Sequence, residues 1–287
     1  MGTEEDIEMK YLSICSGIEA ATVAWASLHW KPIAFAEIDA FPSAVLKHRF
    51  PSVLNLGDIS KIDWESYHGK IDLVVGGTPC QSFSIAGDRT GLNGASGLVY
   101  QYFRLLEECK PRWFIWENVP GVLSSNRGKD FQSILRTWND CGYGVAWRVL
   151  DSQFFGVPQR RKRVFAVGYF GDWKAPTKVL FDGEQINAVL HPRKAGGGHL
   201  PSIKRTDGGL TLERLSQVVF TATEGMRKLT PLECERLFGF PDGWTDIPWR
   251  GKDHAPDGLR YKALGNSMCV NTIKWLGQRI ERVEAGK

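Results

Sequence analysis

One cysteine in the chain stands where a nucleophile would be placed. The stretch from Gly76 to Ser84 reads Gly-Gly-Thr-Pro-Cys-Gln-Ser-Phe-Ser, and it follows an apolar run, Ile71 to Val75, that predicts a buried strand. Two glycines at a strand end let the backbone turn sharply and approach a ligand closely. Cys80 is therefore expected at the rim of a sheet, where open α/β sheets bind ligands. A free cysteine is also commonly a small buried hydrophobe, so this stretch alone leaves both interpretations open.

Carboxylates near the ends of the second and third predicted strands suggest a nucleoside site. Glu37 lies twenty residues beyond Gly17, the glycine of the turn after the first predicted strand, and Asp58 follows the third. A glycine turn with an acid at the end of strand two is typical of folds that bind an adenosine, because the carboxylate accepts hydrogen bonds from the ribose. The turn has a single glycine, which disfavours a dinucleotide and favours a cofactor without phosphates. Asp58 could bind an adenine amino group, although each acid alone also fits a solvated loop.

A third acid and a basic run complete the candidate chemistry. Glu117 comes directly after the apolar run Trp113 to Trp116, so it is expected to be partly desolvated and suited to donating a proton. The alternative is an ion pair, with Arg161 or Arg163 as the partner. The run Gln159 to Arg163 could be a clamp for a phosphate or a base, since arginine offers a fixed fork of donors. It could equally be an ordinary solvated strand end.

Strands that alternate with helices predict an α/β fold with a doubly wound, mainly parallel sheet. The expected strands are 11–14, 32–35, 53–56, 71–75 and 113–116, with a closing hairpin of 145–150 and 163–169; the expected helices are 19–28, 43–50, 98–109, 131–139, 231–238 and 271–283. Residues 87–96 are expected to be a mobile loop. Residues 172–228 are expected to be irregular. The predicted organisation is a catalytic domain over 10–171, a separate small unit over 172–228, and a segment over 229–287 that returns to the catalytic domain.

Composition and charge narrow the class of protein. The chain has 287 residues and a formal net charge of +4, and none of its six cysteines forms a CxxC pair, so neither a metal site nor a disulfide framework is predicted. Lys174 to Lys228 holds nine Lys and Arg against five Asp and Glu, which equals the net charge of the whole chain. The absence of a long apolar run, and an acidic start unlike a signal peptide, predict a cytoplasmic protein with no membrane partner.

Four short motifs occur in a recognisable order. They are Pro79-Cys80-Gln81, Glu117-Asn118-Val119, Gln159-x-Arg161-x-Arg163 and Gly265-Asn266-Ser267. Together they resemble the DNA cytosine-5 methyltransferases, over nearly the whole chain apart from 172–228. The stretches 227–241 and 261–267 also resemble motifs of that family, and the helix after the second is expected to pack beside the first helix. The resemblance implies a Rossmann-like fold that uses S-adenosylmethionine, with 172–228 as a target-recognition domain.

The resemblance also implies a mechanism. Cys80 as thiolate would attack C6 of a cytosine flipped out of double-stranded DNA, while Glu117 holds N3 and the exocyclic amine. The ring would then take the methyl group at C5, and loss of the C5 proton and of Cys80 would restore it. Arg161 and Arg163 would hold the base and the adjacent backbone.

Binding residues carried over from the family fall into two groups. The cofactor residues are Ile14, Cys15, Gly17, Ile18, Glu37, Ile38, Asp58, Ile59, Pro79, Leu98, Asn266 and Ser267, and the DNA-binding residues are Gln81, Ser84, Arg89, Gln159, Arg193, Lys194, Lys204 and Arg205. Two departures stand in the first turn. The family commonly has Phe, which packs on adenine, at the position of Cys15, and Gly-Gly at Glu19-Ala20. Two alternatives are open here: a lower cofactor affinity, or another side chain that fills the gap.

Three rival functions follow from the same residues. An RNA cytosine-5 methyltransferase would use the same scaffold, but the basic variable segment favours DNA. A catalytically silent DNA-binding relative is disfavoured by the intact Cys80, Glu117 and Arg161, and a thiol-dependent NAD enzyme by the single-glycine turn. The chain is expected to act as a monomer in a bacterium or a phage, with a cognate restriction endonuclease as a separate partner.

Overall fold

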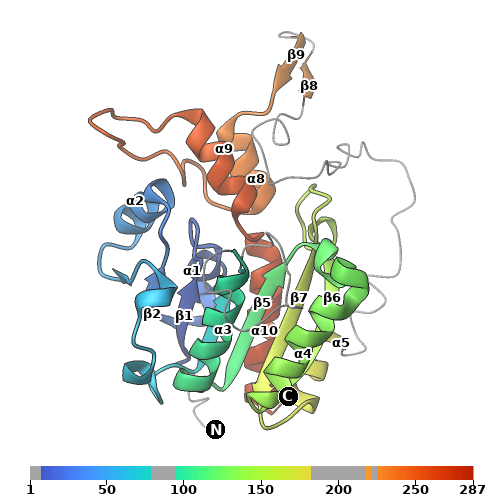
Figure 1. Cartoon of the computed structure of the whole chain (residues 1–287). Helices are drawn as coiled ribbons and strands as arrows, with labels where there is room; N and C mark the ends of the chain where they lie inside the picture. Colours follow the sequence, from blue (N-terminus) through green and yellow to red (C-terminus); the bar gives the residue numbers. More distant parts are fainter. Residues whose placement is uncertain (1–7, 79–94, 182–217, 222–224, 287) are drawn as a thin grey trace, which may run out of the picture.

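The computed structural model describes residues 8–78, 95–181, 218–221 and 225–286. In this part of the chain, seven strands form one sheet in the order β3-β2-β1-β4-β5-β7-β6 (Figure 1). The strands are β1 (Lys10–Ile14), β2 (Lys31–Ala36), β3 (Leu54–Asn55), β4 (Leu73–Gly76), β5 (Trp113–Asn118), β6 (Tyr143–Asp151) and β7 (Lys162–Phe170). The first five are parallel, and β7 runs antiparallel to both of its neighbours. The predicted doubly wound α/β fold and its closing hairpin are confirmed.

Helices cover both faces of the sheet. The α-helices are α1 (Ala20–Trp25), α2 (Ala40–Arg49), α3 (Ala95–Cys109), α4 (Lys129–Asp140), α5 (Lys174–Phe181), α8 (Pro231–Phe238), α9 (Asp257–Asn266) and α10 (Val270–Glu284). Short 3₁₀ turns are Ala26–Leu28, Ile59–Lys61, Glu65–Tyr67, Pro120–Leu123, Ser125–Gly128 and Ser152–Phe154. Figure 1 shows α3 and α4 in front of the sheet, α10 behind it, and α8 and α9 above it. No described helix is long and apolar enough to cross a membrane.

Two hydrophobic cores result from this layering. In β5, Trp113 and Ile115 belong to the core shared with α1, α5 and α10, whereas Phe114 and Trp116 belong to the core shared with α3 and α4. All four side chains are fully buried. A strand that is covered on both faces reads as a continuous apolar run rather than as an alternation, which is why this strand was readable in the sequence.

The C-terminal helix returns to the start of the chain, as the sequence predicts. The Trp25 indole donates to the backbone oxygen of Ile273 at 3.0 Å, so α1 and α10 are joined at their buried faces. A Cβ at Gly277 would lie 2.3 Å from the Trp25 Nε1, so this close crossing requires glycine. The Trp113 indole donates to Glu284 at 2.7 Å, which also ties the end of α10 to β5.

The expectation that residues 172–228 are irregular is wrong at both ends of that segment. Helix α5 packs against β6, β7 and α10, and the Arg148 guanidinium donates to the Leu180 oxygen at 2.9 Å. A helix of two turns is too short to show a clear period in the sequence. At the other end, β8 (Val218–Thr221) and β9 (Gly225–Lys228) form an antiparallel hairpin above the sheet (Figure 1). The helices packed on the sheet therefore include residues up to Phe181, and the target-recognition role of the remainder stays a prediction.

Candidate active site

A cavity of about 730 Å³ opens at the carboxyl edge of the sheet, beside the ends of β1, β2, β4 and β5. It brings together most of the predicted site residues that the structure describes: Cys15, Gly17, Glu37, Ile38, Asp58, Ile59, Leu98, Glu117, Arg161, Arg163 and Asn266 line it. Ile14, Ile18 and Ser267 are buried and are not among the lining residues. Outside the described residues lie Pro79, Cys80, Gln81, Ser84, Arg89, Arg193, Lys194, Lys204 and Arg205, together with residues 87–94 of the predicted loop 87–96. The last two residues of that predicted loop instead begin α3.

Glu37 is held in place by the first turn. Its Oε2 accepts from the Gly17 backbone N–H at 2.8 Å, and its Oε1 accepts from Asp39 N–H at 2.8 Å. Burial raises the pKa of this carboxyl above its ordinary value. Each carboxylate oxygen can accept a further bond, so Glu37 can still bind hydroxyl groups presented in the cavity.

Asp58 and apolar side chains form the neighbouring wall. Asp58 lies at the start of the turn Ile59–Lys61, where hydrogen bonds from Ser60 lower its pKa. Ile38 lies at the cavity with 69% of its surface exposed. An acid at the end of β2, a second carboxylate and aliphatic walls, without a glycine-rich phosphate cradle, fit a nucleoside such as that of S-adenosylmethionine.

Glu117 forms an ion pair with Arg163. Their Oε1 and Nε atoms are 3.0 Å apart, and each side chain is 14% exposed. The antiparallel pairing of β5 with β7, which sets Glu117 opposite Phe165, brings the two side chains to the same end of the sheet. The ion-pair alternative is therefore confirmed with Arg163 and not with Arg161, and the pair itself lines the cavity.

The two glycines before the predicted nucleophile serve close approach to neighbouring strands. A Cβ at Gly76 would lie 2.2 Å from the Ile14 oxygen, and one at Gly77 would lie 2.6 Å from the Glu117 oxygen and 3.1 Å from its Oε2. Neither glycine has a positive φ. Within the described residues, glycine is therefore required at these positions by close packing and not by a left-handed backbone. Gly77 leaves the room that the Glu117 carboxylate occupies.

Thr78 is fixed by two residues at the end of β5. The Asn118 amide donates to the Thr78 oxygen at 3.0 Å, and the Trp116 indole donates to the Thr78 hydroxyl at 3.2 Å. The chain is thus held firmly two residues before Cys80. The sequence showed Asn118 only as part of a motif, and this positioning role became visible once β4 and β5 were neighbours.

Arg161 has a different environment from the one expected. Its Nη2 donates to the backbone oxygens of Gly265 at 3.2 Å and Ser267 at 2.7 Å, and its guanidinium lies over the Phe238 ring at 5.0 Å. Burial, and then the charge of Arg163, lower its pKa to about 9, so it remains charged at neutral pH. Arg161 thus joins the start of β7 to the α9–α10 connection, and its role in holding a base stays a prediction.

Gln159 is inside the protein, although it was expected at a DNA surface. Only 4% of its surface is exposed, and its Oε1 has no hydrogen-bond partner among the described atoms. A contact with DNA would require this side chain to be uncovered. In the described part of the chain, no three His, Cys, Asp or Glu side chains are grouped as ligands for a metal ion.

Glu19 points into the protein instead of toward the cavity. It is fully buried, has a left-handed backbone (φ 63°), and caps α1 by accepting from the Thr22 backbone N–H at 3.0 Å. Burial raises the pKa of this carboxyl from 4.5 to about 7. The departure from the family at this position therefore has a structural consequence, with no direct contact to the cavity.

The folded protein should lose stability between about pH 4.5 and 7 through Glu19. In that range the unfolded chain releases the proton while the fold retains it, so the free energy of unfolding falls as pH rises, by on the order of 3 kcal/mol for this group. Glu19→Gln should remove this component. In urea unfolding, the free energy of unfolding of the variant relative to that of the wild type should therefore be higher at pH 8 than at pH 5. The exposed Glu65→Gln should not. Equal pH slopes for wild type and Glu19→Gln would contradict the assignment.

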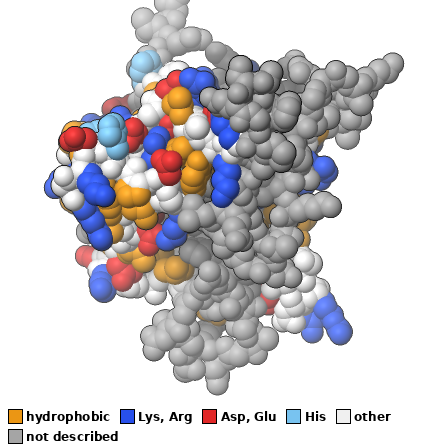
Figure 2. Space-filling view, turned by 90° about the horizontal axis from the view of Figure 1, so that it is seen from above, with side chains coloured by type: hydrophobic (Ala, Val, Ile, Leu, Met, Phe, Trp, Pro, Cys, Tyr) orange, Lys and Arg blue, Asp and Glu red, His pale blue; other side chains and the backbone are white. Residues whose placement is uncertain are grey.

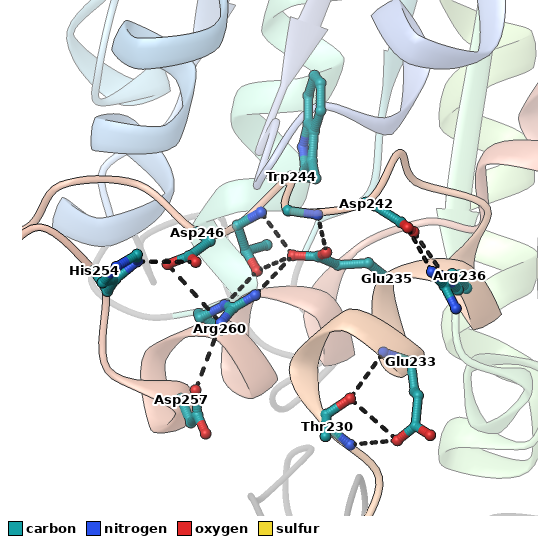
Figure 3. A network of polar contacts seen from close by, with 12 residues as sticks. Thr230, Glu233, Glu235, Arg236, Asp242, Trp244, Asp246, His254, Asp257 and Arg260 are labelled. Carbon is teal, nitrogen blue, oxygen red and sulfur yellow. Dashed lines mark hydrogen bonds and ion pairs between the residues drawn. The ribbon is translucent and has the colours of Figure 1, made fainter.

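The segment between α8 and α9 is organised by a buried ion pair (Figure 3). Glu235 is fully buried and accepts from Gly243 N–H at 2.7 Å, Thr245 N–H at 2.8 Å and the Arg260 guanidinium at 3.3 Å. Arg260 also donates to the Thr245 hydroxyl at 3.0 Å. Trp244, in the same segment, donates to the Ile18 oxygen at 2.9 Å and so reaches the turn after β1, whose Cys15 and Gly17 line the cavity.

The cavity also has a side formed mostly by residues outside the motifs, with Lys262 of the stretch 261–267 as the exception. It is lined by Asp39 and Phe41 at the start of α2, by Trp249 of the α8–α9 segment, and by Lys262 of α9. Lys262 Nζ lies 3.4 Å from Asp39 Oδ2, which bridges α9 and α2. Seen from above (Figure 2), Lys and Arg side chains lie interspersed with acidic and hydrophobic ones on the described part of this face. No spacing signal in the sequence connects residues about 200 positions apart.

Comparisons with known proteins agree with this geometry. Residues 9–194 and 182–282 match the family described as C-5 cytosine-specific DNA methylase. A protein of Escherichia phage P1 named DNA N-6-adenine-methyltransferase is 32% identical over 96% of this chain, which spans 61% of that protein's length. The Type II methyltransferase M2.BsuMI of Bacillus subtilis is 30% identical, over 96% of this chain and 76% of that protein.

Solved structures show the same fold. The S. pombe Dnmt2 methyltransferase superposes with a TM-score of 0.69 at 17% identity, over 97% of this chain and 100% of that one. A putative DNA modification methyltransferase encoded in an E. coli prophage gives 0.65 at 19% identity, over 96% and 99%. With a family match over most of its length and this sheet order, the chain belongs to the C-5 cytosine-specific DNA methylase family.

Proposed function

We propose that the protein transfers a methyl group from S-adenosylmethionine to C5 of a cytosine in double-stranded DNA, and that the cytosine is flipped out and bonded through C6 to Cys80. The observation that carries the proposal is that a single cavity holds two groups of residues, each suited to a different ligand. Glu37 and Asp58 line one part of it as a nucleoside site, and the Glu117–Arg163 pair lines another. A methyl donor and a base can therefore meet in one cavity.

Each described residue has a defined task in this reaction. Glu37 binds the ribose hydroxyls, and Asp58 binds the adenine amino group. Glu117 holds N3 and the exocyclic amine of cytosine, while Arg163 fixes the carboxylate that does so. S-adenosylmethionine supplies an electrophilic methyl group.

The covalent step belongs to Cys80. Cytosine C5 is a weak nucleophile, so bond formation between the Cys80 sulfur and C6 is required to raise electron density at C5. C5 takes the methyl group and then loses its proton to a base or water, and the electron pair expels the Cys80 thiolate. Aromaticity is restored, and the cysteine returns to its starting state.

The identity of the methylated base is the sharpest test. One relative is named for adenine N-6 methylation, whereas the family is described by cytosine C-5. The chain should be expressed in a host that lacks DNA methylation, and the nucleosides of its DNA and RNA should be quantified by mass spectrometry. We expect 5-methylcytosine in DNA, and bisulfite sequencing should locate it in one sequence context. N6-methyladenine alone, or 5-methylcytosine in RNA alone, would contradict the proposal.

The biological setting remains a separate prediction. Relatives carry both the name Type II methyltransferase and the name orphan methyltransferase. A cognate endonuclease acting separately, a monomeric state and a cytoplasmic location in a bacterium or phage-infected cell are therefore predictions. The first prediction can be tested by expressing candidate endonucleases that cut at the bisulfite-mapped site. A cognate endonuclease should kill cells that lack this methyltransferase and spare cells that carry it.

A further inference from the structure

A tight hairpin carries Trp249 to the cavity. Trp249 and Lys252 exchange backbone hydrogen bonds of 2.9 and 3.0 Å, and the two residues between them have left-handed backbones, with φ 48° at Arg250 and 78° at Gly251. This is the geometry of a two-residue hairpin turn. A non-glycine residue such as Arg250 adopts it only where the surroundings hold it there. The hairpin is anchored on either side by the buried Ile247 and Ala255.

Trp249 is held from two directions. Its indole packs edge-on against Phe41 of α2, with ring centroids 5.3 Å apart and planes at 84°, and the Arg250 guanidinium lies over the indole ring at 5.2 Å. Phe41 is itself buried, whereas Trp249 is half-buried and lines the cavity. An aromatic side chain fixed in this way can meet a ligand with little loss of conformational freedom.

The nucleoside part of the cavity otherwise has aliphatic walls. Cys15, Ile38, Ile59 and Leu98 line it, and among the described lining residues Phe41 and Trp249 are the aromatic ones. Contact with the face or edge of an aromatic side chain makes the binding free energy of a purine ring substantially more favourable. Trp249 is thus the aromatic side chain that remains accessible for this purpose.

The position of Phe41 shows which end of the ligand Trp249 meets. Phe41 lies four residues after Glu37, at the start of the helix that follows the ribose-binding acid. The sulfonium that carries the methyl group, which joins the nucleoside to the amino acid, must face Glu117 and Arg163, where the methyl group meets the base. Trp249, packed on Phe41, therefore lies at the nucleoside end.

We infer that Trp249, presented by the 249–252 hairpin, is the aromatic wall against which the nucleoside of S-adenosylmethionine binds. This assignment rests on the proposed function and concerns the same cavity. It places a binding residue in the segment between the α8 and α9 helices, outside every motif that the sequence indicated.

The test measures cofactor affinity without turnover. Calorimetric titration of the whole chain with S-adenosylhomocysteine should show a dissociation constant about tenfold higher for Trp249→Ala than for the wild type, which is the scale of one aromatic–base contact. Trp249→Phe should retain most of the affinity. The same relative loss is expected for 5′-methylthioadenosine, which keeps the nucleoside and lacks the amino acid.

Trp173→Ala is the matched control, because Trp173 is 63% exposed and does not line the cavity. It should bind like the wild type, and circular dichroism should show that each variant is folded. A Trp249→Ala constant within twofold of the wild type would overturn the inference, as would a loss seen with S-adenosylhomocysteine but not with methylthioadenosine. A wild-type chain that binds neither ligand would instead overturn the proposed function on which the inference rests.

Discussion

Replacing Cys80 with alanine should reduce methyl transfer by more than about 10³-fold while DNA binding persists, because the variant loses the atom that bonds to C6 and little else. The described cysteines offer no substitute. Cys15 lines the cavity, but burial and the charge of Glu37 raise its thiol pKa to about 12, so almost no thiolate is present at neutral pH. Incorporation of labelled methyl groups into duplex DNA measures the loss.

The matched control is Cys141→Ala. Cys141 is partly exposed and lies at the end of α4, away from the cavity, and its thiol pKa is also raised to about 12 by burial and Glu107. It should retain wild-type activity. DNA that carries 5-fluorocytosine should form an adduct that survives denaturation with the wild type and with Cys141→Ala, but not with Cys80→Ala. Substantial methylation by Cys80→Ala would refute the covalent mechanism.

Glu117→Gln should lower kcat by about 10²- to 10⁴-fold, the usual contribution of a positioned acid or base. The amide keeps the shape of the side chain but removes the charge that faces Arg163 at 3.0 Å and the proton that N3 would share. Loss of the ion pair leaves the largely buried Arg163 guanidinium without its carboxylate, so the free energy of unfolding should also fall by about 1–3 kcal/mol. Single-turnover methylation and urea unfolding measure the two effects separately.

Cofactor affinity separates a chemical role of Glu117 from general damage. Glu117→Gln should bind S-adenosylhomocysteine like the wild type, because Glu37 and Asp58 at the nucleoside end are unchanged. The double variant Glu117→Gln/Arg163→Gln should unfold with less than the summed losses of the single variants, since the two groups share one interaction. Glu117→Gln with kcat within tenfold of the wild type would show that the ion pair is only structural.

Much of the fold could be predicted because its signals are local. Apolar runs such as 71–75 and 113–116 mark strands that are covered on both faces. Thr230 followed by Pro231 is typical of a helix start, and in the structure Thr230 and Glu233 are bonded reciprocally at the start of α8. Helix α5 could not be predicted with the same rules. Its eight residues are stabilised by packing of Val179 and Leu180 under α10, which no local pattern reports.

The site divides in the same way. The sequence by itself determined which residue types follow the strands, because motif order and strand ends are properties of the chain, and it thereby indicated Cys80, Glu37, Asp58 and Glu117. Only the tertiary structure decided their partners: that Arg163 and not Arg161 faces Glu117, that Arg161 holds the α9–α10 connection, and that Trp249 reaches α2. The physical reason is that a partner is chosen by distance and burial in the folded state. Chain segments about 40 to 200 residues apart meet there only after the sheet has set their positions.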